Sequence, residues 1–193
     1  MIYTLTANPA IDYNIACDGL SANTVNRTRN AVYTPNGKGL NVSFTLNHYG
    51  VDTTILGFFA GFSGEFIVKG AEALGVPVKP VWTDGITRVN VFLNAGPDTE
   101  YNMVNAGAAI NAANEQEMFE LIDSLDDMTC LVISGSPPTP LRVSWPRSCA
   151  VLRQRVPSSC SISRAISWPT SLPWSRCSLS PTTTSCSTSL ALR

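Results

Sequence analysis

Short apolar segments, each bounded by glycine, proline or polar residues, recur along the first two-thirds of the chain. Four of them are rich in β-branched and aromatic residues and predict strands, at residues 1–5, 53–60, 88–94 and 129–134. The second and the fourth are almost entirely apolar, which is typical of buried strands. In the third, valine and leucine alternate with arginine and asparagine, which indicates one apolar and one polar face.

Three segments between these strands show helical spacing of apolar residues, at residues 39–50, 64–75 and 114–125. Gly50 and Gly75 end the first two, as glycine often does directly after a helix. Asn114 and Glu117 have the spacing of a capping box at the start of the third. Strands that alternate with helices of this length predict an α/β fold with a mostly parallel sheet covered by helices.

Two further segments are polar and alternating, and they predict a small, exposed antiparallel flap. They are VNRTRNAVYT, at residues 25–34, and the stretch from RVNVFLN to TEYNMV, at residues 88–104. No segment reaches the ~20 apolar residues that a membrane-spanning helix needs, so no membrane partner is expected.

Composition divides the chain near residue 136. All 14 acidic residues and all 13 glycines lie in residues 1–136, which carry a net charge of −8. Residues 137–193 contain no Lys, Asp, Glu or Gly, and carry a net charge of +7 with 14 serines and 8 prolines. The acidic first part argues against a nucleic acid as its natural partner.

Three interpretations of residues 137–193 are open. A basic, serine-rich tail could bind RNA or an acidic membrane surface. A disulfide-stapled unit is disfavoured, because without a secretory signal a reducing cytoplasm is expected. The spacing of the four cysteines in this part also fits no zinc site, and these are Cys149, Cys160, Cys177 and Cys186. We favour an out-of-frame translation or similar sequence lesion, which explains the abrupt loss of four residue types. The prolines and the lack of periodicity then predict a disordered or non-native tail.

The strongest local motif is PNGKGLNVS, at residues 35–43, where a glycine-containing turn enters a predicted helix. Gly37 and Gly39 flank Lys38. Glycines let the backbone approach a ligand closely, and a helix N-terminus offers unpaired N–H groups to an anion. The motif fits neither a Walker A loop nor a dinucleotide fingerprint, because both spacings fail. A tight structural turn and a site for an anion or a polyhydroxyl compound are both open.

Other polar residues could belong to the same kind of site. Asp12 closely follows the first strand, at the edge where α/β sheets bind ligands, and a carboxylate there could accept hydrogen bonds from sugar hydroxyls. Arg88 and Asn90 share one face of a strand and suit phosphate and hydroxyl groups. Arg27 and Arg29 form a cationic pair in an acidic region. The alternatives are an exposed turn for Asp12 and solvated surface positions for the others.

No metal site or catalytic triad can be assembled from the sequence. His48 is the only histidine, and no acid or cysteine stands at ligand spacing from it. Cys17 and Cys130 are expected to be small buried apolar residues.

Five segments taken together, TLTANPAID, PNGKGLNVS, GFFAGFSGEFI, GITRVN and LVISGS, resemble the PfkB (ribokinase-like) family of sugar kinases in order and spacing. Within that family the chain is most similar to the bacterial 1-phosphofructokinases, followed by the tagatose-6-phosphate kinases. The resemblance covers residues 1–136. It implies a doubly wound αβα sandwich with a small β-stranded lid, formed by residues of about 13–36 and 86–104, which often serves as a homodimer interface.

The resemblance also implies roles for single residues. Asp12 would bind sugar hydroxyls, and Ser136 would lie at the floor of the pocket. Arg27, with Arg29 as a second candidate, would bind the phosphate already on the substrate. This contact could be made across a dimer, with the substrate of the partner. The other substrate-binding residues would line the sugar-phosphate pocket or close it from the lid, and these are Gly37, Lys38, Gly39, Asn41, Arg88 and Asn90.

The second half of the family pattern is missing. Family members carry a Gly-Ala-Gly-Asp motif, whose glycines form an anion hole and whose aspartate acts as the base, beside a pocket for ATP with Mg²⁺. Here no glycine follows Gly135, no acid follows Asp127, and the family's SGSLPPG reads SGSPPTP. We therefore expect this chain to be truncated and inactive, without a catalytic aspartate, and to bind neither ATP nor Mg²⁺.

The expected parent enzyme is cytoplasmic and converts fructose 1-phosphate and ATP to fructose 1,6-bisphosphate. Tagatose 6-phosphate is the alternative substrate. A non-catalytic fragment that binds a sugar phosphate is the alternative from another functional class.

Overall fold

The computed structural model describes residues 1–136 and residue 138, so the expected tail and its cysteines lie outside the described residues. The first sheet has four parallel strands in the order β5–β4–β1–β8. The strands are β1 (Ile2–Thr6), β4 (Thr53–Phe59), β5 (Val78–Trp82) and β8 (Cys130–Ser134). Three of them confirm predicted strands, and β4 is buried along its whole length. The sequence pattern did not predict β5, because a lysine and a proline interrupt its apolar residues.

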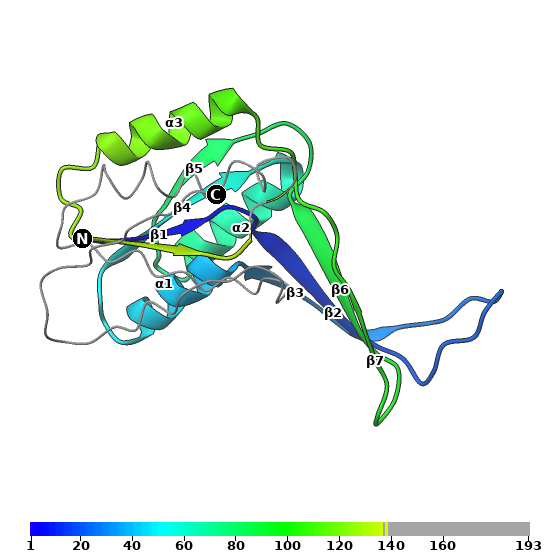
Figure 1. The fold of residues 1–193 in the computed structure, drawn as a ribbon. Helices are drawn as coiled ribbons and strands as arrows, with labels where there is room; N and C mark the ends of the chain where they lie inside the picture. The colour runs from blue at the N-terminus through cyan, green and yellow to red at the C-terminus, as the bar shows by residue number, and fades with distance from the viewer. Residues whose placement is uncertain (137, 139–193) are drawn as a thin grey trace, which may run out of the picture.

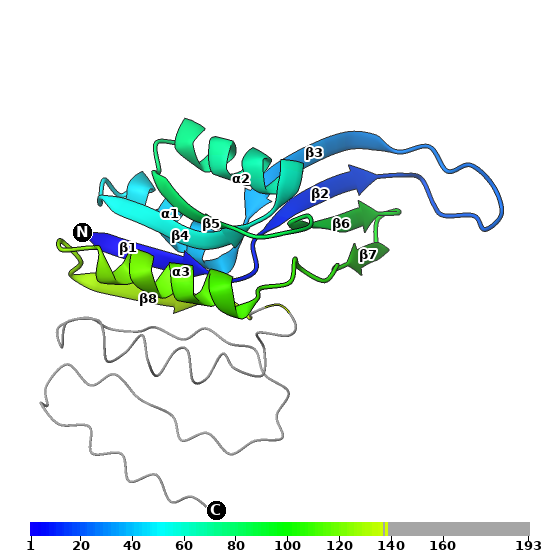
Figure 2. The same ribbon diagram turned by 90° about the horizontal axis from the view of Figure 1, so that it is seen from above.

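Three helices cover the two faces of this sheet (Figures 1 and 2). α1 (Lys38–His48) and α2 (Gly61–Ala73) lie on one face, and α3 (Ala112–Asp123) lies on the other. They confirm the three predicted helices, with boundaries shifted by one to three residues. The predicted capping box of α3 was wrong: the box is formed by Asn111 and Asn114, because the helix begins two residues earlier and the Asn111 side chain accepts the Asn114 N–H at 2.9 Å.

Each face of the sheet buries its own apolar cluster. Successive strand residues point to opposite faces, so Leu56 joins the cluster under α3, with Leu5 and Met118. Its neighbour Ile55 joins the cluster under α1 and α2, with Leu40. This burial on both faces confirms the expected doubly wound sandwich.

A second sheet of four strands, here called the lid, extends from one end of the sandwich (Figures 1 and 2). Its order is β3–β2–β6–β7, and its strands are β2 (Ala10–Ala16), β3 (Arg29–Asn36), β6 (Arg88–Asn94) and β7 (Glu100–Met103). The β2–β3 and β6–β7 pairs are antiparallel, as expected of the flap. The expectation of an entirely antiparallel flap was wrong at its centre, since β2 and β6 run parallel. Both leave the sandwich in the same direction, each following a parallel strand.

The lid meets the sandwich at the carboxyl ends of the parallel strands. β1 passes into β2 through residues 7–9, and β3 passes into α1 at Gly37. Thr87 fixes the start of β6, because its hydroxyl accepts the Ala60 N–H at 2.8 Å and its carbonyl accepts the Ser63 hydroxyl at 2.6 Å. The polar residues of the lid are thereby held next to the start of α1.

Two sequence expectations concern the burial of cysteines and the presence of membrane-spanning helices. Cys17 is buried as predicted, but Cys130 is only half-buried, because it opens β8 at the far end of the sheet. None of the helices among the described residues is long and apolar enough to cross a lipid bilayer.

Tyr3 links β1 to the turn that precedes β8. The Tyr3 side chain is buried, and its hydroxyl donates to Oδ1 of the exposed Asp127 at 2.7 Å. Burial, this hydrogen bond and the charge of the Asp127 carboxylate raise the pKa of Tyr3 to about 12. A tyrosine in the unfolded chain ionises near pH 10, so the folded state holds this proton more tightly. The stability from the hydroxyl is therefore complete below about pH 10 and is lost as the pH rises towards 12.

We expect Tyr3→Phe to lower the free energy of unfolding near neutral pH by roughly 1.5–3 kcal/mol, the range for a hydrogen bond to a charged group. In urea unfolding at about pH 8 and pH 11.5, the difference from the wild-type chain should be largest at the lower pH. Tyr49→Phe, at a tyrosine that is 77% exposed, is the control and should stay within about 0.5 kcal/mol at both. An equal cost of Tyr3→Phe at both pH values would contradict the assignment.

Candidate functional site

Asp12 lies in β2 and is the only buried acidic side chain among the described residues, with 8% of its surface exposed. The exposed turn considered for it is therefore excluded. Asn90 Nδ2, from β6, donates to Asp12 Oδ1 at 2.9 Å, and Asn36 Nδ2, from the end of β3, donates to Asp12 Oδ2. A carboxylate has about four acceptor positions, so further positions are left for a ligand. This arrangement suits a ligand that donates hydroxyl hydrogen bonds.

Backbone N–H groups determine which way the two amides point. Gly37 N–H donates to Asn36 Oδ1 at 2.6 Å, and Asn105 N–H donates to Asn90 Oδ1 at 3.3 Å. Because a backbone N–H can only donate, both amide oxygens must face these groups and both NH₂ groups must face Asp12. Sequence reasoning missed Asn36 and Asn105. Asn36 stands inside the PNGKGLNVS motif, where its polar side chain could have marked it, whereas no pattern marks Asn105.

The start of α1 lies beside this group because α1 packs very closely on β1. The first N–H groups of a helix have no acceptor within the helix. Thr6 Oγ1 accepts one of them, the Leu40 N–H, at 3.1 Å, and the N–H groups of Lys38 and Gly39 remain without an intrahelical partner. A Cβ on Gly39 would overlap the Thr6 hydroxyl and lie 3.0 Å from the carbonyl oxygen of Leu5. Glycine is thus required here by packing. The same packing holds the positive end of the helix dipole at the strand ends.

Arg88 opens β6 and is half-buried. One of its Nη atoms donates to the Asn8 carbonyl at 3.0 Å, while its buried Nε has no hydrogen-bond partner. Burial lowers the pKa of Arg88, and the negative charge of Asp12 opposes this effect. The guanidinium still stays charged, because arginine is not deprotonated in proteins. Arg88 pairs with Ala10, two residues before the pair of Asp12 and Asn90 along the same two strands. A cation with an unused N–H donor at this position suits an anionic ligand.

Lys38, Asn41 and Ser136 lie at the solvent-facing side of this group. Lys38 and Asn41 are exposed in the first turn of α1, and the Asn41 Nδ2 donates to Asn36 Oδ1 at 2.8 Å. Ser136 is exposed and follows Gly135, where an added Cβ would lie 3.8 Å from the Lys38 Cβ. The end of β8 is therefore close to the start of α1.

Arg27 and Arg29 are not brought to this group by the fold of one chain. Arg27 is exposed in the hairpin between β2 and β3, which reaches away from the sandwich (Figures 1 and 2). Arg29 forms an ion pair with Asp18 at 2.6 Å on the exposed surface of the same hairpin. A contact of either arginine with a ligand at Asp12 would need a second copy of the chain.

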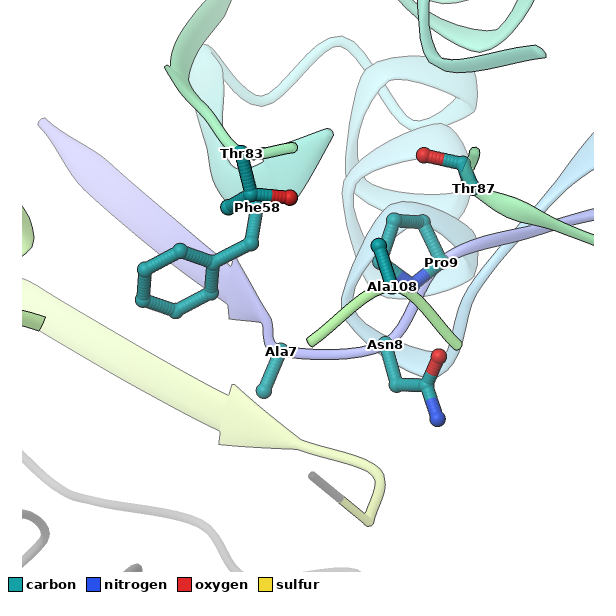
Figure 3. A pocket seen from close by; sticks show the side chains of 7 residues that line it. All are labelled: Ala7, Asn8, Pro9, Phe58, Thr83, Thr87 and Ala108. Atoms are coloured by element: carbon teal, nitrogen blue, oxygen red, sulfur yellow. The ribbon is translucent and has the colours of Figure 1, made fainter. Parts of the chain in front are cut away.

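A small cavity lies near the site but is separate from it (Figure 3). Its volume of about 10 Å³ has room for one water molecule. The Thr83 hydroxyl, buried without a hydrogen-bond partner, points into it. The lining residues are Ala7, Asn8, Pro9, Phe58, Thr83, Thr87 and Ala108. None of the predicted site residues is among them, and the cavity is too small for a sugar.

The described residues do not fit an ATP–magnesium site. No group of three His, Cys, Asp or Glu side chains that could hold a metal ion occurs in residues 1–136 and 138. Both oxygens of Asp12 already accept amide hydrogen bonds, which suits hydroxyl donors better than a cation. No phosphoryl-transfer step follows from these residues alone.

Comparison with known proteins places this chain in a family. The model of the pfkB family of carbohydrate kinases matches residues 5–169. D-tagatose-1-phosphate kinase from Klebsiella oxytoca is 45% identical over 138 residues, which are 72% of this chain and 45% of that protein. 1-phosphofructokinase from Bacillus subtilis is 34% identical over 141 residues, 73% of this chain and 46% of that protein. The chain thus spans about half the length of the curated relatives it matches.

A solved structure supports the same relationship. Phosphofructokinase-2 from Escherichia coli, in complex with fructose-6-phosphate, matches with a TM-score of 0.74 and 25% identity over 84% of this chain and 54% of that one. The family match runs past Ser136 to residue 169, so the domain boundary expected at residue 136 stays a prediction. Family model, relatives and fold agree, and the chain belongs to the pfkB family of carbohydrate kinases.

Proposed function

We propose that the described residues bind a ketose phosphate, and that the parent enzyme phosphorylates this sugar with ATP, converting fructose 1-phosphate to fructose 1,6-bisphosphate. The buried Asp12 carboxylate carries the proposal, since it offers acceptor positions for hydroxyls at the junction of lid and sandwich. Arg88 and the start of α1 supply anion-binding groups nearby. Hydroxyls and an anion are the two kinds of group that a sugar phosphate presents.

The relatives that are 34% identical or more support a 1-phosphate as the substrate. One is named for D-tagatose 1-phosphate, and another is a 1-phosphofructokinase. Fructose and tagatose differ only in the configuration at C4. A site that accepts both 1-phosphates would therefore be selective for the position of the phosphate and less selective for the configuration of the C4 hydroxyl. Tagatose 6-phosphate is the alternative, and it differs in that position.

The chain of 193 residues is proposed to bind the sugar without transferring a phosphoryl group. Residues 137–193 contain no Asp, Glu or Gly, so they supply neither a carboxylate base nor a glycine-built anion hole. Phosphoryl transfer depends on such positioning and charge stabilisation. The kinase activity is accordingly assigned to the parent enzyme.

Calorimetric titration of the full chain should show saturable binding of fructose 1-phosphate, with weaker binding of fructose 6-phosphate. Arg88→Ala is expected to weaken binding roughly 10- to 100-fold, because a charge-assisted hydrogen bond contributes about 1.5–3 kcal/mol. The control is Lys79→Ala, at an exposed cation on β5, which should bind like the wild-type chain. No binding by a folded, monodisperse sample would refute the proposal.

A coupled assay with fructose 1-phosphate, ATP and Mg²⁺ should give no turnover above background for the same sample. The physical reason is the missing base, without which the attacking hydroxyl keeps its proton. Turnover at a rate typical of kinases, about 1–100 per second, would show that the chain contains the transfer machinery after all.

The lid carries an apolar face on the side opposite Asp12. Strand register places four side chains in one row across β3, β2, β6 and β7, namely Tyr33, Tyr13, Val91 and Met103. Tyr13 and Tyr33 stack with ring centres 4.3 Å apart, yet Tyr33 is 53% and Met103 47% exposed. Asp12 and Asn90 precede Tyr13 and Val91 by one residue and therefore face the other way. We propose that this face forms a homodimer interface, through which Arg27 would approach the partner's site.

Tyr33→Asp should shift the mass measured by light scattering from dimer towards monomer, because it places an unpaired charge in an apolar contact. Tyr49→Asp makes the same exchange directly after α1, away from the lid, and should leave the mass unchanged. A wild-type chain that is monomeric at about 100 μM would be evidence against the interface.

A further inference from the structure

Asn36 joins three segments of the chain through one side chain. It is the last residue of β3 and precedes Gly37, the N-cap of α1. Its Nδ2 donates to Asp12 in β2, and its Oδ1 accepts both the Gly37 N–H at 2.6 Å and the Asn41 Nδ2 at 2.8 Å. No other side chain among the described residues bonds both to Asp12 and to α1.

The orientation of this amide follows from one donor that cannot be reversed. Gly37 N–H must donate, so Asn36 presents its oxygen to α1 and its NH₂ group to Asp12. Asn41 must then turn its own NH₂ group towards Asn36, which directs its Oδ1 away from Asn36. Asp12 and Asn41 consequently both present oxygen acceptors, one from the lid and one from the helix.

We propose that Asn36 is a positioning residue of the site, whose amide sets the relative orientation of Asp12 and Asn41 so that both accept hydrogen bonds from ligand hydroxyls. Asn36 itself acts through these two side chains and need not touch the ligand. The inference rests on the proposed function only for the identity of the ligand. The bridge itself can be tested without one.

Asn36→Asp separates the two halves of this role. A carboxylate at position 36 still accepts from Gly37 and Asn41, but it repels Asp12 instead of donating to it. The other groups that face Asp12 are the Asn90 amide and the Arg88 guanidinium, both from β6. Two adjacent carboxylates favour a shared proton, and a shared proton restores the missing donor at low pH.

The measurement compares fructose 1-phosphate binding by wild-type and Asn36→Asp chains at about pH 8 and pH 5. The affinity of each variant is compared with that of the wild-type chain at the same pH, because the sugar phosphate itself titrates near pH 6. Asn36→Asp should bind fructose 1-phosphate at least about 10-fold more weakly than the wild-type chain at pH 8. At pH 5 its affinity should be within roughly threefold of the wild-type affinity. Asn47→Asp is the matched control. It removes an exposed amide of α1 that donates to the Leu74 carbonyl at 3.0 Å, and it should stay within about threefold at both pH values.

A second readout needs no ligand. In Asn36→Asp, the carboxyl carbon signals of Asp12 and of position 36 should titrate together in two separated steps, as expected of a pair that shares a proton. Independent titration of the two carboxyls would overturn the inference, as would binding that is equally weak, or equally strong, at both pH values.

Two further outcomes are also decisive. If the wild-type chain binds no ketose phosphate, the proposed function fails and the carbon titration still tests the bridge. If Asn36→Asp is unfolded at about pH 8, recovery of the native fold at pH 5 supports the bridge, and failure at both pH values contradicts it.

Discussion

One buried charge constrains the arrangement of lid and sandwich. A carboxylate can remain inside a protein only if hydrogen bonds or opposite charges replace the water that it loses. Asp12 receives amide donors from β6 and from the junction of β3 with α1, and the Arg88 cation acts on it electrostatically. Asn90 and Arg88 belong to the lid itself, so moving the lid relative to α1 would break the contacts of Asn36, which bonds both to Asp12 and to the start of α1. The geometry of the candidate site is therefore tied to the position of the lid.

The fold brings these groups together through strand direction and close packing. Parallel strands place their carboxyl ends at one edge, and the chain leaves that edge into β2 and β6 of the lid. Gly39 lets α1 pack against Thr6 and Leu5, so that the helix starts at the same edge. Carboxylate, guanidinium and helix start thus come from distant parts of the sequence, and a ligand with hydroxyls and an anion matches them.

Sequence patterns revealed the elements whose periodicity is strong. β4 and β6 could be predicted because one is apolar throughout and the other alternates. β2 and β5 were missed, since Asp12 and Asn14 interrupt the apolar residues of β2, and a lysine and a proline interrupt those of β5, so that only pairing with neighbours makes them strands. Motif reasoning likewise selected Asp12, Gly39 and Arg88. It missed Asn36 and Asn105, because their importance comes from the direction of a hydrogen bond that no spacing encodes.

The central claim is that the Asp12 carboxylate, held by amides from two sides, accepts the hydroxyls of a phosphorylated ketose. A crystal structure of the chain grown with fructose 1-phosphate tests this most directly. The account predicts sugar hydroxyl oxygens about 2.5–3.0 Å from the Asp12 oxygens, with the phosphate against Arg88 or the first amides of α1. A sugar bound elsewhere, or an Asp12 site that stays empty at saturating ligand, would contradict it.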